Sequence, residues 1–237
     1  MSRYPLMSSP RCGRWARLQS SWYTSEVRNS GRMYATAVSC GLATVVVCAG
    51  CATRMRIDLP AAPAYPGTKK VDVSVELLLT DSFRNYEASF RPTNWTFDTV
   101  YLALGKTLCE NTEVLARRLF EEVIVTEGNQ PRRDGVAVVL SPAVESVDQI
   151  WAQTAFGEGH SLITVTWSLT DPGGTTVWQD RIVGEASGPW GTGFTWMGNL
   201  QERMQTALEQ LFLNSFEAMS HSERIRSLRQ NASKRVR

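Results

Sequence analysis

The sequence predicts an α+β fold: a two-layer sandwich in which two amphipathic helices cover one face of a mostly antiparallel sheet of about four to five strands. Two segments, 71–79 and 161–170, alternate apolar and polar residues with the period of a half-buried strand. Two others, 99–120 and a segment beginning at Asn199, carry apolar residues at helical spacing. The order of strand, helix, short strand, strand, hairpin and helix is that of an α+β two-layer domain.

The first strand and the first helix follow each other closely. In 71–79 (VDVSVELLL) apolar side chains recur at every second position, which predicts a strand with one buried face. The segment 99–120 is predicted to be a helix of five to six turns, with Asp98 placed to cap its start. Its apolar stripe consists of Val100, Leu104, Leu108, Leu115 and Leu119.

The second half of the chain is predicted to contain strands and a closing helix. A short strand at 123–125 precedes an apolar strand that begins at 136 and continues after Pro142 to Ile150. Segments 161–170 and 175–186 form a hairpin around the turn Asp171-Pro172-Gly173-Gly174. Asn199 and Glu202 have the spacing of a capping box at the start of the last helix. The stripe of that helix is Leu200, Met204, Leu208, Leu211, Ser215 and Met219.

These elements give a division of the chain into four parts. Residues 1–50 are predicted to be a signal peptide that is cleaved, and 51–70 an acylated cysteine followed by a flexible, proline-containing tether. A single domain spans 71–220, and a basic tail spans 221–237. One domain of this length is large enough to bury a core.

The charge distribution argues against a nucleic-acid binder. Of the 25 Lys and Arg residues, six arginines precede Cys51, and of the 23 Asp and Glu residues only Glu26 does. The remaining 19 basic and 22 acidic residues make 51–237 mildly acidic. A nucleic-acid-binding surface needs a broad basic face, so we expect no nucleic-acid partner.

The leader has the order of a secretory signal. Arg28 and Arg32 precede an uncharged run from Tyr34 to Cys51, which ends in small residues. Ala49-Gly50-Cys51 resembles the lipobox of bacterial lipoproteins, although position 48 holds a cysteine in place of the usual aliphatic residue. The resemblance implies a diacylglycerol on the Cys51 thiol, palmitate among its acyl chains, and cleavage just before this cysteine. Ala52, where an inner-membrane lipoprotein would have Asp, implies passage to the outer membrane, facing the periplasm.

Two alternatives for the leader stay open. An uncharged run of this length could just span a bilayer as an uncleaved anchor, although its many small residues favour a signal. Translation could also start at Met33, which would remove every arginine from the leader.

No catalytic, metal or cofactor site can be assembled from the sequence. Gly105-Lys106-Thr107 lacks the glycine that a P-loop needs at position 100, which is Val. His160 and His221 have no partners at metal-ligand spacing. Cys109 is expected to be a small buried hydrophobe rather than a reactive thiol. We therefore expect a protein that is not an enzyme and uses no cofactor.

Two features admit a functional as well as a structural interpretation. The glycine-rich loop 187–198 carries Trp190, Phe194 and Trp196. These rings either complete the core or form an exposed patch for a partner protein or an acyl chain. The tail from 224 holds six Lys and Arg residues and is either a solvated end or a contact for lipid phosphates or peptidoglycan acids.

The whole arrangement resembles small periplasm-facing lipoproteins. The lipobox, the tether, a strand, the segment 104–125, a hairpin and a closing helix are shared with auxiliary lipoproteins of ABC-type transport systems and with the lipopolysaccharide-assembly lipoprotein. The resemblance implies a membrane-anchored accessory of an envelope complex, with a protein partner. A small-molecule or lipid-binding lipoprotein with an apolar cleft between helices and sheet is the alternative, and a hydrolase whose site the sequence hides is a third.

Overall fold

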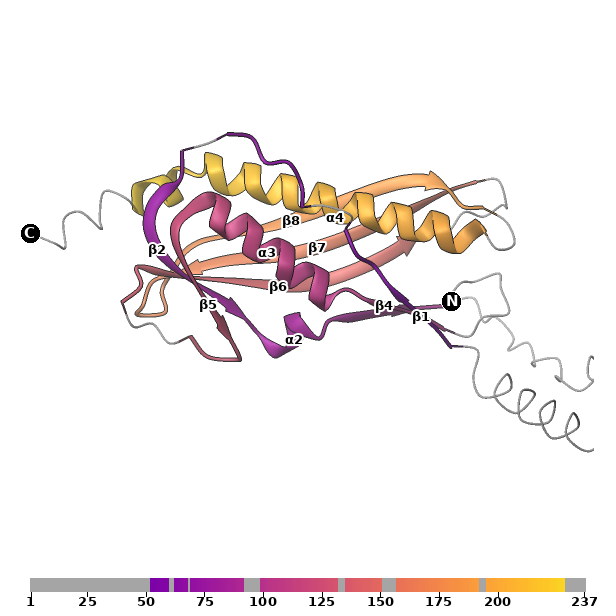
Figure 1. Ribbon diagram of the computed structural model, residues 1–237, viewed down its shortest axis with the longest axis horizontal. Helices are drawn as coiled ribbons and strands as arrows, with labels where there is room; N and C mark the ends of the chain where they lie inside the picture. Colours follow the sequence, from indigo (N-terminus) through magenta and orange to yellow (C-terminus); the bar gives the residue numbers. More distant parts are fainter. Residues whose placement is uncertain are drawn as a thin grey trace, which may run out of the picture. The chain divides into compact units, whose positions relative to one another are not determined.

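The computed structural model describes residues 52–228 except 60, 61, 68, 92–98, 132–134, 151–156 and 192–194 (Figure 1). All of these residues belong to one compact unit, Cys51–Arg237. The α+β class is confirmed. In chain order the described elements are β1 (Ala52–Arg56), β2 (Val71–Leu79), α2 (Asp81–Arg84), β3 (Glu87–Phe90), β4 (Thr99–Ala103), α3 (Gly105–Leu119), β5 (Phe120–Glu127), β6 (Val138–Ile150), β7 (Glu158–Thr170), β8 (Thr176–Pro189) and α4 (Thr195–His221).

The larger sheet has five strands in the order β5-β2-β6-β7-β8. Strands β6, β7 and β8 are antiparallel, and β7 with β8 is the predicted hairpin. Strand β2 instead pairs in parallel with both β5 and β6, so the sheet is mixed and not purely antiparallel. The reason is the connection: α3 stands between β2 and β5, and a crossover through a helix brings the chain back in its original direction.

A second, three-stranded sheet has the order β1-β4-β3, with β1 parallel and β3 antiparallel to β4. Its central strand occupies the first five residues of the predicted helix 99–120, whose start is therefore wrong. Val100 and Leu102 are both fully buried, as the alternation of a strand requires. The helix itself begins at Gly105, and its predicted stripe of leucines is buried. The proposed cap, Asp98, lies outside the described residues.

The segment after β1 is packed onto the helices, where the sequence predicted a flexible tether. Ile57 is fully buried, and its carbonyl accepts a hydrogen bond of 2.6 Å from the Thr107 hydroxyl of α3. Gln205 of α4 donates to the carbonyl of Asp58 at 2.7 Å. The prolines of this segment have no backbone donor, and its carbonyls find their partners in helix side chains.

The same segment makes further contacts near its end. Tyr65 stacks on Phe216 of α4 with ring centroids 5.0 Å apart, and Arg118 of α3 donates to the carbonyl of Pro66 at 3.1 Å. Figure 1 shows this coil running along α4 before it enters β2. The described part of 52–70 therefore belongs to the folded body.

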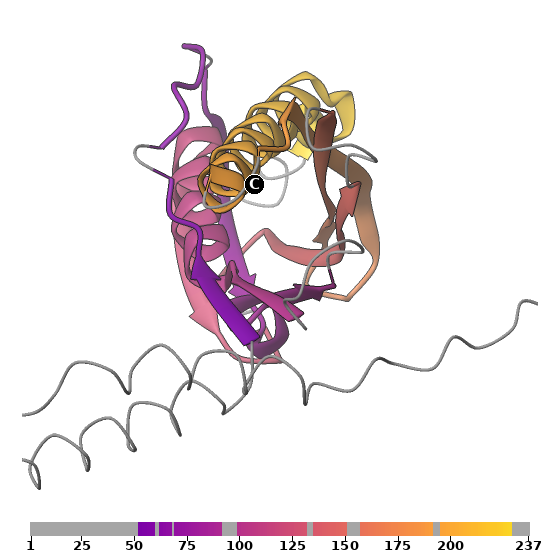
Figure 2. The same cartoon turned by 90° about the vertical axis from the view of Figure 1, so that its right-hand side faces the viewer.

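Helix α4 packs on β7 and β8, and α3 packs on β5 and β2 (Figure 2). The sheet curves around the two helices, which also contact each other. Trp167 of β7 meets Phe212 of α4 edge-on, with centroids 6.5 Å apart, at the centre of this layer. Helix α4 begins at Thr195, one turn before the predicted cap Asn199. Its predicted stripe, from Leu200 to Met219, is buried.

The C-terminal end departs from the predicted solvated tail. Residues 223–228 form a further helical segment, and Ile225 is only 1% exposed. The basic residues from Arg229 onward lie outside the described residues.

Close approach of α4 to β8 gives a test of this packing. A Cβ at Gly184 would lie 2.0 Å from the carbonyl oxygen of Ala207 and 2.6 Å from the backbone nitrogen of Leu211. Gly184→Ala is therefore expected to lower the free energy of unfolding by about 3 kcal/mol or more, because backbone must move. Urea titration followed by circular dichroism measures the change.

Gly198→Ala is the matched control. It lies in α4 and a Cβ there meets nothing within 4 Å, so alanine should leave stability unchanged or raise it by up to about 1 kcal/mol. Equal stability of the Gly184→Ala and Gly198→Ala proteins would contradict the described contact of α4 with β8.

Candidate functional site

The predicted acylation site stands immediately before the first strand. Cys51 lies outside the described residues, and the next residue, Ala52, begins β1. Strand β1 is held by parallel pairing with β4 along its whole length, from Ala52 opposite Thr99 to Arg56 opposite Ala103. A group attached to Cys51 is thus separated from the folded body by no spacer.

Two of the three aromatic residues of the loop 187–198 are in the core. Trp190 is 4% exposed and Trp196 is 2% exposed, and their rings stack with centroids 6.1 Å apart. They offer little surface to a partner, so an exposed patch is not formed by these two rings. Phe194 lies outside the described residues.

A buried arginine that the sequence analysis did not single out lies beside this aromatic pair. Arg203 of α4 is 4% exposed, and its guanidinium lies over the Trp190 ring at 5.4 Å from the centroid. Its Nη1 donates to the carbonyl of Pro189 at 2.7 Å. The described chain supplies no hydrogen-bond partner for Nε or Nη2, although both atoms are buried.

One glycine makes room for this guanidinium. Gly159 and Gly188 are cross-strand partners at the open end of the β7–β8 hairpin. A Cβ at Gly159 would lie 3.1 Å from both Cζ and Nη2 of Arg203, which is a crowded contact. A Cβ at Gly188 would lie 3.4 Å from Cγ of Arg203, which is an ordinary contact with the stem of the side chain.

Polar groups continue from this position into the layer between helix and sheet. The fully buried Ser161 donates through its hydroxyl to the Gln149 side-chain oxygen at 2.8 Å, and Gln149 donates to the Met204 sulfur at 2.8 Å. We call Arg203, Gly159, Gly188 and Trp190 the arginine niche.

The arginine niche holds a positive charge that no acidic side chain of the described chain neutralises through an ion pair. Burial lowers the pKa of the Arg203 guanidinium below its ordinary value. An arginine still stays charged, and a buried charge without a partner costs on the order of several kcal/mol. One signal in the sequence points to this residue: Arg203 falls between Leu200 and Ala207 on the apolar stripe of α4, where a charge is rarely placed.

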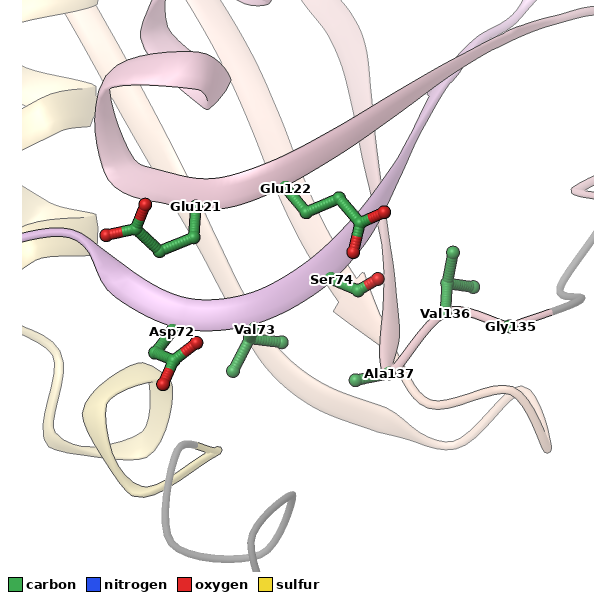
Figure 3. Close-up of a pocket in the computed structure, with 8 residues that line it drawn as sticks. All are labelled: Asp72, Val73, Ser74, Glu121, Glu122, Gly135, Val136 and Ala137. Atoms are coloured by element: carbon green, nitrogen blue, oxygen red, sulfur yellow. The ribbon is translucent and has the colours of Figure 1, made fainter. Parts of the chain in front are cut away.

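An open groove of about 440 Å³ lies between β2, β5 and the segment before β6 (Figure 3). Its carboxylates are Asp72, Glu121 and Glu122, and Figure 3 shows Glu122 beside Ser74, its cross-strand partner. The residues that line the groove include no cation. This groove is an acidic surface, and nothing in it identifies a ligand.

A second, smaller groove of about 280 Å³ lies between β1, α2 and the start of α3. It holds three basic side chains, each of which is already paired with an acid. The pairs are Arg56 with Asp58 at 2.8 Å, Arg84 with Glu127 at 2.8 Å, and Lys106 with Glu110 at 3.5 Å. Exposed pairs of this kind leave little net attraction for an anion.

The remaining candidates for chemistry are separated. Within the described ranges, no three His, Cys, Asp or Glu side chains gather as a metal site. His160 lies 3.7 Å from Glu185, and the half-buried Cys109 is on α3. Gly105, Lys106 and Thr107 begin α3, and Thr107 holds the Ile57 carbonyl, so no phosphate-binding loop precedes them. Among the described helices, none is long and apolar enough to cross a membrane.

Comparison with known proteins gives structural similarity alone. No protein-family model matches the chain, and no curated protein does. A crystal structure from Xanthomonas campestris of the family DUF330 superposes with a TM-score of 0.46 at 14% identity, covering 77% of this chain and 99% of that one. A minor lipoprotein from Acinetobacter baumannii gives a TM-score of 0.39 at 13% identity, covering 69% and 96%.

Lipoprotein B from Nitrosomonas europaea, solved by NMR, gives a TM-score of 0.35 at 9% identity and covers 72% of this chain and 93% of that one. At these TM-scores the likeness carries no argument about function. What this chain does must therefore be inferred from its own residues.

The half-buried Cys109 gives a test of the site chemistry. Burial raises the pKa of its thiol to about 11, and the nearby Arg84 opposes this shift only in part. Because the thiolate is the nucleophile, alkylation of Cys109 by iodoacetamide at pH 8 should be roughly 100-fold slower in the folded than in the urea-unfolded protein.

The pH dependence follows from the same shift. A raised pKa keeps the folded thiol protonated, so its alkylation rate should climb about tenfold per pH unit until pH approaches 11. Peptide mass spectrometry assigns the modification to Cys109. A rate that levels off near pH 8.5 in the folded protein would show an ordinary, solvated thiol instead.

Proposed function

We propose that this chain is an exported, non-enzymatic lipoprotein, anchored through Cys51 to the outer membrane and facing the periplasm, where it is an accessory subunit of an envelope transport or assembly complex. One observation carries the proposal: the uncharged run from Tyr34 ends in Ala49-Gly50-Cys51 after a basic flank. This is the order that export and lipid attachment require.

The position of β1 supports attachment at Cys51. The first described element, β1, begins at Ala52, so a signal peptidase that cuts before Cys51 would remove the leader without touching any described element. Acyl chains on this cysteine would hold the start of β1 at the bilayer surface, because no spacer separates the two. The body would then have a restricted orientation toward the membrane.

The edge of the larger sheet supports an accessory role. Strand β8 forms one edge of the larger sheet and is 14 residues long. A long edge strand offers backbone donors and acceptors to a protein partner, and its charged residues Asp180, Arg181 and Glu185 discourage unspecific pairing.

The alternative, a lipid-binding lipoprotein with a large apolar cleft, has less support. Trp167, Leu108 and Leu208 are fully buried between the helices and the sheet, so in the described residues this layer is filled by side chains. Both described grooves are open, and charged residues line each of them.

Metabolic labelling with radioactive palmitate tests the anchor. The wild-type chain should be labelled, and globomycin, which inhibits the lipoprotein signal peptidase, should make the uncleaved precursor accumulate. Cys51→Ser should abolish the labelling, because its hydroxyl cannot form the thioether.

Cys40→Ser and Cys48→Ser are matched controls, since both cysteines lie in the same uncharged run. Both variants should be labelled like the wild type. Labelling that survives Cys51→Ser would refute Cys51 as the acylation site, and a wild-type chain that takes up no label would refute the lipid anchor itself.

A further inference from the structure

A role in membrane attachment does not explain why the arginine niche holds a buried positive charge. Helix α4 places Arg203 against the open end of the β7–β8 hairpin, where Gly159 and Gly188 face it. The chain surrounds one charged group with backbone and an indole ring. It supplies a partner for Nη1 only.

The two nitrogens of Arg203 that lack a partner in the described chain, Nε and Nη2, are arranged so that they select anions of a particular shape. Nε and Nη2 form one edge of the planar guanidinium and donate two parallel hydrogen bonds. This edge matches two oxygens of a carboxylate or of a phosphate. The carbonyl of Pro189 accepts from Nη1 and so fixes the rotation of the group, which leaves the Nε–Nη2 edge as the part without a hydrogen-bond partner in the described chain.

The surroundings of the guanidinium strengthen a hydrogen bond from it to an anion. Trp190 covers one side of the guanidinium, and exposure of the whole Arg203 side chain is 4%. With little water to compete, a charge-assisted hydrogen bond is stronger than at a surface. The niche nevertheless lies next to the surface, because Glu158 and Pro189, at the adjoining ends of β7 and β8, are exposed.

We propose that the arginine niche is a binding site for a small oxyanion group, a carboxylate or a phosphate monoester, held by two hydrogen bonds from Nε and Nη2 of Arg203. The site is independent of the lipid anchor, because it lies in the layer between α4 and the β7–β8 hairpin. A ligand would contribute the negative charge that the described chain does not supply.

Titration of the full-length chain, purified in an uncharged detergent, tests this proposal. The probes are sodium acetate and methyl phosphate, compared with sodium chloride at equal ionic strength. The ¹⁵Nε–¹H resonance of Arg203, assigned by its loss in Arg203→Lys, should shift saturably with at least one probe. The probe with the lower dissociation constant identifies the carboxylate or the phosphate as the preferred chemistry.

Thermal unfolding gives a second readout. At about ten times the dissociation constant, the binding probe should raise the unfolding midpoint of the wild type by roughly 3 to 6 °C. Arg203→Met, which keeps the length of the side chain without the charge, should lose this rise. Arg203→Lys, which keeps the charge without the planar edge, should lose most of it.

Arg181→Met is the matched control, because Arg181 is an exposed arginine of β8 that is paired with Glu145. It should respond to the probe like the wild type. An Arg203 resonance that neither probe moves would show that neither a carboxylate nor a phosphate binds at Nε and Nη2, and would overturn the proposal. An equal rise in the midpoint of Arg203→Met would do the same, since the effect would then be unspecific.

Discussion

The hydrogen bond from the Thr107 hydroxyl to the carbonyl of Ile57 holds the segment after β1 against α3. It joins the first turn of α3 to the end of β1, and both groups are buried. A buried carbonyl that lost this partner would stay unsatisfied, which costs about 1–3 kcal/mol. Together with the pairing of β1 and β4, this contact turns a proline-containing stretch into part of the body.

The consequence for the proposed anchor is geometric. A lipoprotein with a long flexible tether can place its body anywhere within reach of the tether. Here the segment from Ile57 to Pro66 is bound to α3 and α4, so it does not lengthen the distance that the folded body can move from the membrane. An anchor at Cys51 would present the same part of the protein to the bilayer each time, which suits a subunit that must meet a partner in one orientation.

The arginine niche and the acidic groove show two ways in which a small domain carries charge. The groove of Asp72, Glu121 and Glu122 is open, and solvent screens its carboxylates. Arg203 is shielded from water, so its charge must be balanced by hydrogen bonds, by the Trp190 ring and by what binds its remaining edge. Of the two, only the buried Arg203 has a fixed orientation, so only Arg203 can select a ligand by the geometry of its hydrogen bonds.

The sequence predicted the elements whose period is set by one buried face. Segments 71–79 and 161–170 alternate because they lie in the sheet with their odd-numbered residues inward, and the stripe of α4 is buried as expected. Segment 99–103 was misassigned, because Val100 and Leu104 fit helical spacing as well as a strand. Pairing with β1 and β3, distant in sequence, decides its structure.

The site residues were predictable only in part. Cys51 is predicted from a local pattern and lies outside the described residues. For Trp190 and Trp196 the sequence left two interpretations open, and the structure places both rings in the core. Arg203 could not be assigned from the sequence, because the niche depends on Gly159 and Gly188 facing α4 across two strands. The charge on an apolar stripe was the only local signal.

Mass spectrometry of the N-terminal peptide of the native protein, extracted from membranes, decides whether Cys51 carries the anchor. We expect the peptide to begin at Cys51 and to carry a diacylglyceryl group on its sulfur. A native chain that begins upstream of Cys51, with an unmodified thiol at that position, would refute the lipid anchor.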